Sequence, residues 1–214
     1  RELLDRMQVW AEAHTPNPDA KATELLKYLQ AVCHPDRDWT NERVVVFTEY
    51  RDTQDWLVRL LQQDGLGAGV RVLHGGMNAV ERENLRQAFQ ADPTEDSVRI
   101  LIATDAASEG IDLHWQCHRL INYDIPFNPN KLEQRIGRID RYGQRFDPEV
   151  FHFVGTGFGR AVDTYEADLE FLARVAEKVA RMEEDLGAVN AVLADAVQRR
   201  MLGQNVDLDH AVEE

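Results

Sequence analysis

The chain has 214 residues, with 24 Lys and Arg against 38 Asp and Glu, which gives a formal net charge of −14. Hydrophobic residues make up 43% of the chain, a share that predicts a folded protein rather than a disordered one. The acidic balance excludes a simple basic nucleic-acid-binding module, and two cysteines exclude a disulfide scaffold. The apolar runs are strand-length, so we expect no membrane helix. The chain opens without Met or an apolar leader, and we expect it to be a piece of a longer intracellular protein.

The first 40 residues predict two helices joined by a linker. Residues 1–14 have a helical pattern, and two prolines within residues 15–19 interrupt it. Asp19 is typical of a helix N-cap, and the next helix would line one face with Leu25, Leu26 and Leu29. We expect residues 34–38 to end this second helix.

From residue 43 onward, short apolar runs alternate with helical patterns. The runs predict strands at 44–47, 70–73, 98–103, 119–123 and 150–154. Helices are predicted over 53–63, from a capping box at Asn78 and Glu81 through Phe89, and from a capping box at Asn130 and Glu133 to about Arg141. This alternation predicts an α/β fold, a parallel sheet with helices on both faces. In such sheets ligands bind beyond the carboxyl ends of the strands, so we expect the chemistry in the loops there.

The chain after Gly155 predicts helices to near its end. Its apolar residues recur about every 3.5 positions from Leu169 to Val197. We expect a C-terminal helical appendage that packs on the sheet domain; the alternative is a brace against another domain or a partner protein. The expected domains are therefore N-terminal helices and linker (1–40), the sheet domain (41–157) and the C-terminal helices (158–214).

The strongest local signal is the run QRIGRIDRYGQ at residues 134–144. Between positions 131 and 145 five cations stand against two acids, in a chain that is otherwise acidic. On an ideal helix Gln134, Arg138 and Arg141 fall on one narrow stripe. Planar guanidinium groups suit phosphate oxygens, so two on one stripe could hold the terminal phosphate of a nucleoside triphosphate. The alternative from the charge pattern alone is a helix whose arginines pair with surface carboxylates.

Other segments accompany this run in a definite order. They are FTEY at 47–50, LHGGM at 73–77, ATDAASEGIDL at 103–113 and DIPFNP at 124–129. Together with residues 134–144 they resemble the motifs of the second RecA-like lobe of superfamily-two helicases and translocases, over about residues 40–155. The RYGQ ending and the DIPFNP segment are similar to the bacterial Swi/Snf branch. The resemblance implies a RecA-like parallel sheet, here with N-terminal helices and a C-terminal helical appendage added.

The resemblance also implies roles for individual residues. Arg138 and Arg141 match catalytic arginine fingers. The positions that match the nucleotide site are Gln134, Gly110 and Asp112, the last a candidate ribose contact. The positions that match contacts to nucleic acid are Thr48, Tyr50, His74, Gly75 and Thr104, and Tyr50 could also stack on a base. Glu109 stands where the family often has Arg, a departure that affects the contacts around it.

Two motifs of a complete motor are absent from the sequence. No lysine follows a glycine, as a Walker A loop requires, and no Asp is followed by Glu, as in Walker B. We therefore expect ATP and Mg²⁺ to be held mainly by a preceding RecA-like lobe of the same protein, and this chain alone to hydrolyse no ATP. The residues near Cys33 and Cys117 fit no standard zinc pattern, so we expect no metal site.

The sequence thus predicts the second motor lobe of an ATP-dependent helicase or translocase in the bacterial cytoplasm. Its expected partners are nucleic acid, double-stranded DNA by the Swi/Snf resemblance, the first lobe, and a protein bound through the C-terminal helices, with no membrane. Two alternatives remain open. The chain could be a degenerate regulatory or protein-docking module, or the corresponding lobe of an RNA helicase.

Overall fold

A computed structural model of the chain describes residues 2–14, 17–105, 110–126 and 128–153. The helices in this part are α1 (Glu2–His14), α2 (Ala20–Cys33), α3 (Arg51–Gln63), α4 (Ala79–Gln90) and α6 (Pro129–Ile136), with 3-10 turns at Pro35–Arg37 and Gly67–Gly69. The strands are β1 (Val44–Thr48), β2 (Val70–Leu73), β3 (Ile100–Thr104), β4 (Arg119–Asn122) and β5 (Glu149–His152). The expected C-terminal helices lie outside the described residues.

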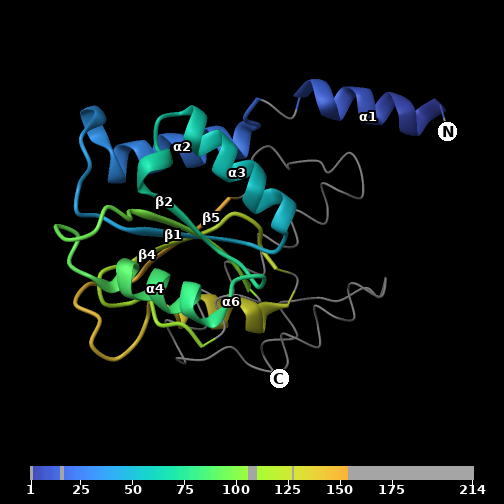
Figure 1. Cartoon of the computed structure of the whole chain (residues 1–214). Helices are drawn as coiled ribbons and strands as arrows, with labels where there is room; N and C mark the ends of the chain where they lie inside the picture. The colour runs from blue at the N-terminus through green and yellow to red at the C-terminus, as the bar shows by residue number, and fades with distance from the viewer. Residues whose placement is uncertain (1, 15–16, 106–109, 127, 154–214) are drawn as a thin grey trace, which may run out of the picture.

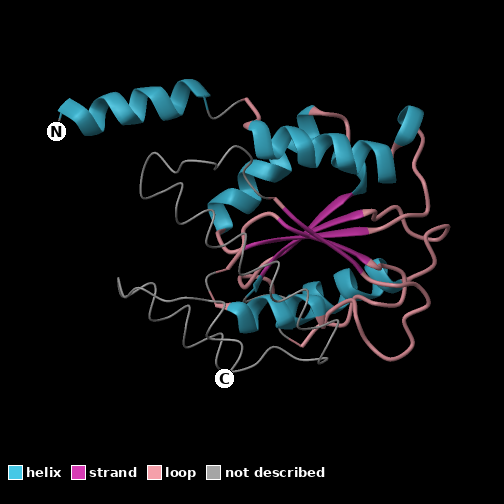
Figure 2. Ribbon diagram, turned by 180° about the vertical axis from the view of Figure 1, so that it is seen from behind, coloured by secondary structure: helices cyan, strands magenta, loops and turns pink. Residues whose placement is uncertain are grey.

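The described strands form one parallel sheet in the order β2-β3-β1-β4-β5. Helices α2 and α3 cover one face of this sheet, and α4 and α6 cover the other (Figure 1). Figure 2 shows the same three layers from behind. The predicted parallel sheet with helices on both faces, the RecA-like arrangement, is confirmed.

Strand β1 is buried along its whole length at the centre of the sheet. Val44 and Val46 belong to one hydrophobic cluster with the apolar faces of α2 and α3, whereas Val45 and Phe47 belong to a second cluster with the apolar face of α4. Successive side chains of a strand point to opposite faces, so a single apolar run supplies both layers of the core. Burial of each such side chain contributes about 1.5–3 kcal/mol.

Two helices begin at the capping residues that the sequence predicts. The Asp19 carboxylate accepts a hydrogen bond from the Ala22 N–H at 2.7 Å, which starts α2. Asn78 and Glu81 form the expected capping box of α4, with hydrogen bonds of 2.9 and 3.0 Å. Because each cap satisfies backbone N–H groups that the first turn leaves without partners, the starts of these helices are readable locally.

Helix α6 differs from its prediction at both ends. Its N-cap is Asn128, whose side chain accepts from the Asn130 N–H, and Pro129 occupies the first helical turn. The capping box predicted at Asn130 is therefore wrong, because proline lacks only an N–H that the first turn would leave unpaired anyway. The helix ends at Ile136, and residues from Gly137 onward form tight turns. The helix predicted to continue to Arg141 is shorter by five positions.

Helix α1 is present where the sequence predicts it and extends away from the sheet (Figure 1). Its large apolar side chains are exposed, among them Leu3, Leu4, Met7 and Val9. Among the described helices, none is long and apolar enough to cross a membrane.

Candidate functional site

The carboxyl ends of β1, β2 and β3 meet at one edge of the sheet, because the strands are parallel. Thr48 at the end of β1 pairs in register with Thr104 at the end of β3, and Leu73 at the end of β2 stands beside Ala103. This carboxyl edge carries the residues that the sequence predicts to contact nucleic acid, namely Thr48, Tyr50, His74, Gly75 and Thr104. The fold therefore brings together residues that are spread over 57 positions of the chain.

The loops of the carboxyl edge present accessible groups at two places. Tyr50, the N-cap residue of α3, is 62% exposed. A Cβ added at Gly75 would meet nothing within 4 Å, so its backbone faces open space. His74 is half-buried, and its Nδ1 accepts a hydrogen bond from the Gly76 N–H at 3.2 Å. An open backbone beside an exposed ring suits contact with a phosphodiester chain.

The two threonines of the carboxyl edge are buried instead. Thr104 is 7% exposed and Thr48 is fully buried. The Thr48 hydroxyl donates to the carboxylate of Asp124, which also accepts from the Glu49 N–H at 3.1 Å. The Thr48 hydroxyl is thus used inside the protein, where it fixes the loop that leads to Tyr50.

Asp124 also connects the carboxyl edge to the N-terminal helix α2. The Lys21 ammonium lies 3.7 Å from the Asp124 carboxylate and donates to the carbonyl oxygen of Tyr123 at 3.0 Å. The same ammonium lies 4.1 Å from the centre of the Tyr123 ring. Lys21 therefore holds α2 against the end of β4 through three contacts of different kinds.

Arg135 of α6 is a buried guanidinium beneath the carboxyl edge, with 1% exposure. Its Nε and Nη2 donate to the two carboxylate oxygens of Asp105 at 2.5 and 2.9 Å. Its Nη1 donates to the Asn122 side chain and to the Asp124 carbonyl oxygen, both at 2.8 Å. A two-pronged pair of this kind has the preferred arginine–carboxylate geometry.

Lys131, one turn before Arg135 on α6, makes the next ion pair along this edge. Its ammonium donates to Glu49 at 2.7 Å and lies 3.8 Å from Asp105. The hydrogen bond to Glu49 is the main cause that raises the pKa of Lys131 above its ordinary value. The acids Glu49, Asp105 and Asp124 are therefore each matched by a cation from α2 or α6.

The second part of the site is the junction between residues 110–113 and the turns at 137–144, which we call the arginine junction. Arg141 donates from Nη1 to the Asp112 carboxylate and from Nε to the Gly137 carbonyl oxygen at 2.8 Å. The Leu113 N–H donates to the carbonyl oxygen of Arg138 at 2.9 Å. The structure thus joins Asp112, Arg138 and Arg141, although the helical stripe predicted for the arginines does not exist, because α6 ends before them.

Two more predicted nucleotide-site residues lie near this junction in the chain. Gly110 is exposed and has a φ of +76°, a conformation that favours glycine. Gln134 is exposed on α6, whose neighbouring residues Leu132, Arg135 and Ile136 are buried. Gln134 therefore lies on the solvent side of the helix and is not part of the contacts that join Asp112 to Arg141.

Sequence reasoning missed several polar residues that hold the carboxyl edge together. Gln54 of α3 is fully buried, and its amide donates to the carbonyl oxygens of Leu73 at 3.0 Å and Ile102 at 2.7 Å. Arg135 and Asp124 were missed as well. The usable signal for Arg135 was the presence of acids just after two predicted strands, since parallel strand ends converge.

Other buried arginines lie at the opposite, amino edge of the sheet and have structural partners. Arg43 donates to the carbonyl oxygens of Val98 at 3.0 Å and Ala91 at 2.8 Å. Arg99 donates to the carbonyl oxygens of Pro93 at 2.6 Å and Asp96 at 2.5 Å. These guanidinium groups satisfy loop carbonyls and leave no face for a ligand.

The two cysteines are free and buried. Burial raises the pKa of the Cys33 and Cys117 thiols to about 12, so both are neutral thiols near pH 7. Within the described part of the chain, no group of three His, Cys, Asp or Glu side chains is placed to hold a metal ion.

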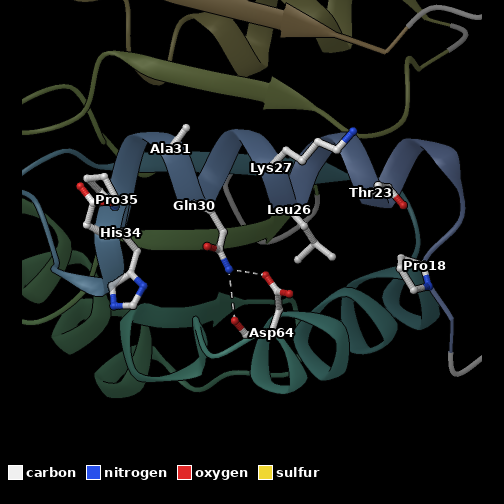
Figure 3. Close-up of a pocket in the computed structure, with 10 residues that line it drawn as sticks. Pro18, Thr23, Leu26, Lys27, Gln30, Ala31, His34, Pro35 and Asp64 are labelled. Carbon is white, nitrogen blue, oxygen red and sulfur yellow. Dashed lines mark hydrogen bonds between the residues drawn. The ribbon is translucent and has the colours of Figure 1, made fainter.

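A groove of about 660 Å³ lies away from the carboxyl edge, between α2 and the end of α3 (Figure 3). Gln30 crosses its floor and donates to the Asp64 side chain at 2.6 Å and to the Asp64 carbonyl oxygen at 3.3 Å. Leu26, Lys27 and His34 line the wall on α2. The groove carries none of the residues that the sequence singles out for chemistry.

Comparison with known proteins gives a consistent family. The model of a family described as the helicase conserved C-terminal domain matches residues 21–143. The "Uncharacterized ATP-dependent helicase YqhH" of Bacillus subtilis (strain 168) is 33% identical over 153 residues, which cover 72% of this chain and 25% of that protein. The RNA polymerase-associated protein RapA of Serratia proteamaculans (strain 568) is 32% identical over 181 residues, covering 78% of this chain and 18% of RapA. The chain thus spans a quarter or less of the length of these relatives.

Among solved structures, the C-terminal part of the Fun30 ATPase domain is similar in fold. The TM-score is 0.58 with 24% sequence identity, and the match covers 72% of this chain and 45% of that one. This similarity supports the fold described above.

Proposed function

Because this chain belongs to the family of helicase C-terminal domains and is homologous to bacterial SNF2-like helicases, we propose that it is the second motor lobe of an ATP-dependent translocase. The nucleotide would lie between this lobe and a RecA-like lobe that precedes it in the whole protein. Nucleic acid would lie along the carboxyl edge, and double-stranded DNA is the track that we propose. Closure of the two lobes would complete the catalytic site.

The observation that carries the proposal is the arginine junction. The Arg141 and Asp112 side chains are 43% and 40% exposed, and such exposed ion pairs contribute only about 0–1 kcal/mol. Arg141 can therefore exchange Asp112 for a phosphate group at little cost. Arg138, linked through its carbonyl oxygen to Leu113, would supply the second guanidinium. Two guanidinium groups near a transferring phosphoryl group stabilise the charge that develops on its oxygens.

ATP with Mg²⁺ supplies the phosphoanhydride bond that is broken and neutralises part of its charge. The donor set of this chain fits the terminal phosphate, because Arg138 and Arg141 are guanidinium groups on adjoining turns. The nearby carboxylates of Asp105 and Asp112 are already paired with arginines. We therefore propose that the magnesium ligands belong to the first lobe, and that Asp112 turns to the ribose when Arg141 leaves it.

Contact with nucleic acid is compatible with the acidic balance of the chain, because the carboxyl edge is locally neutral. The three acids at this edge each have a cationic partner, as described above. A phosphate backbone that approaches Gly75 and Tyr50 would thus meet paired carboxylates rather than free negative charge. Contacts from exposed backbone and one aromatic ring position a nucleic acid without reading its sequence.

The test is ATP hydrolysis by the full-length protein with no nucleic acid, duplex DNA, single-stranded DNA and RNA in parallel. We expect duplex DNA to stimulate hydrolysis most. Arg138→Ala should lower kcat by about 10³-fold or more, the range measured for arginine fingers, with an unchanged circular dichroism spectrum. Stimulation by RNA alone would replace the proposed track with an RNA one.

The competing function is a docking module that has kept the fold without the chemistry. It predicts that the full-length protein hydrolyses no ATP under any of these conditions, and that Arg138→Ala changes nothing. Gly-to-Ala or Arg-to-Ala changes would then matter only through stability. Folded wild-type protein without hydrolysis would therefore refute the motor proposal.

A further inference from the structure

Arg135 contacts the ends of all three central strands of the sheet. Its guanidinium binds Asp105 just after β3 and Asn122 at the end of β4, with the distances given above. It also lies 5.4 Å from the centre of the ring of Phe47 in β1. One side chain of α6 is therefore bonded to, or stacked on, β1, β3 and β4 at once.

The other fully buried arginine shows what a purely structural role looks like in this protein. Arg43 is also 1% exposed, and its hydrogen bonds go to carbonyl oxygens of the α4–β3 connection. Arg135 instead bonds an ionised carboxylate in a two-pronged pair, together with a side-chain amide. Removal of one partner from a buried ion pair is costly, so Asp105 and Arg135 hold each other in one arrangement.

The position of Arg135 in the chain gives this arrangement a consequence. It lies three residues before Arg138, whose carbonyl oxygen is bonded to Leu113 of the arginine junction. Asp105 directly follows Thr104 at the carboxyl edge, and Asp124 fixes Thr48 and the Glu49 N–H there. Arg135 is thus the side chain that joins the phosphate-facing turns to the edge proposed for nucleic acid.

We infer that Arg135 is a positioning residue that makes the carboxyl edge and the arginine junction move as one body. It touches neither nucleotide nor nucleic acid in this inference. What the coupling achieves rests on the proposed function: engagement of nucleic acid at the edge would reach Arg138 and Arg141 through Asp105 and Arg135. The mechanical part of the inference is independent of any activity.

The first arm of the test measures that mechanical part. Amide hydrogen exchange of the full-length protein is compared for wild type, Arg135→Lys and Arg43→Lys. Lysine keeps the charge but lacks the planar fork, so it cannot hold Asp105 and Asn122 together. We expect Arg135→Lys to raise exchange at least tenfold in peptides covering 48–50 and 122–126, and Arg43→Lys to raise it in peptides covering 89–99 instead.

A purely structural role for Arg135 gives a different result. In that case the two variants lower Tm alike, and Arg135→Lys raises exchange evenly across the sheet or not at all, which would overturn the inference. If Arg135→Lys does not fold, Asp105→Asn takes its place, because Asp105 is partly exposed and the amide keeps its shape. The same local pattern is expected from it, and its absence would also overturn the inference.

The second arm measures the ratio of nucleic-acid-stimulated to basal ATP hydrolysis in the same proteins. We expect Arg135→Lys to lower this ratio at least tenfold, while Arg43→Lys keeps it within twofold of wild type. An unchanged ratio in Arg135→Lys would overturn the coupling. If wild type itself shows no hydrolysis, the proposed function fails, and the exchange pattern alone decides whether Arg135 positions the edge.

Discussion

The arginines of this protein divide by burial and by partner. Arg43 and Arg99 are buried and bonded to carbonyl oxygens, and Arg135 is buried and bonded to Asp105. Arg141 is different, because it is 43% exposed and its carboxylate partner is equally accessible. A guanidinium that can change partners needs this exposure, whereas a buried pair is held in place by the cost of leaving one charge alone.

This difference predicts separate effects on stability and on activity. Arg141→Ala should change the free energy of unfolding by about 0–1 kcal/mol, because its ion pair is exposed. Arg135→Ala should lower it by about 3–5 kcal/mol, because Asp105 would be left without its buried partner. Urea denaturation of both variants measures the two values, and ATP hydrolysis by the full-length protein should nevertheless be lost in Arg141→Ala. Equal destabilisation by the two changes would contradict the distinction.

His152 of β5 gives a prediction about pH. Burial, with the charge of Arg135 as a smaller cause, lowers the pKa of His152 to about 4. The folded protein therefore binds this proton more weakly than the unfolded chain does. Stability from this group is complete above pH 6.5 and is lost as pH falls toward 4, on the order of 3 kcal/mol in total.

The measurement is urea denaturation of wild type and His152→Gln between pH 4 and 7. Other titrating groups are common to both proteins, so the difference between the two curves isolates His152. We expect wild type to lose more stability than the variant over this range. Parallel curves would show that His152 titrates alike in the folded and unfolded states.

At the scale of elements, α6 is the helix on which the site depends. It carries Lys131 and Arg135 to the carboxyl edge and then stops at Ile136, so that the arginine junction is built from turns. Turns with i→i+3 hydrogen bonds, such as the 3.0 Å bond from the Arg138 N–H to the Arg135 carbonyl oxygen, are tighter than an α-helix. They aim Arg138 and Arg141 in directions that no helical wheel predicts.

The start of α6 can be tested with a matched pair of changes. Asn128→Ala removes the side chain that accepts from the Asn130 N–H, and we expect a loss of about 1 kcal/mol in the free energy of unfolding. Asn130→Ala lies inside the first turn and should cost less than half as much. Urea denaturation decides between them, and the opposite ranking would restore Asn130 as the N-cap.

The whole molecule combines an acidic surface with two locally balanced regions, the carboxyl edge and the arginine junction. The chain carries arginine fingers in our proposal but no phosphate-binding loop, since no lysine follows a glycine. A nucleotide held by two guanidinium groups alone lacks the cradle and the metal that phosphoryl transfer uses.

We therefore predict that the folded chain of residues 1–214 hydrolyses no ATP by itself. The measurement is phosphate release by the purified chain, with Arg138→Ala as the control that separates intrinsic from contaminating activity. Turnover that disappears in Arg138→Ala would contradict the prediction, since it would show a complete site in this chain.

The sequence by itself determined the elements and their order. The apolar runs of β1 to β4, the caps at Asp19 and Asn78, and the order of the motifs are local signals, because burial pattern and capping act over a few residues. Tertiary structure decided the rest. Arg135 meets Asp105 across 30 positions, and Thr48 meets Asp124 across 76, so no local pattern encodes either contact. These contacts exist because parallel strands bring their carboxyl ends to one edge, where buried polar groups must find partners in each other.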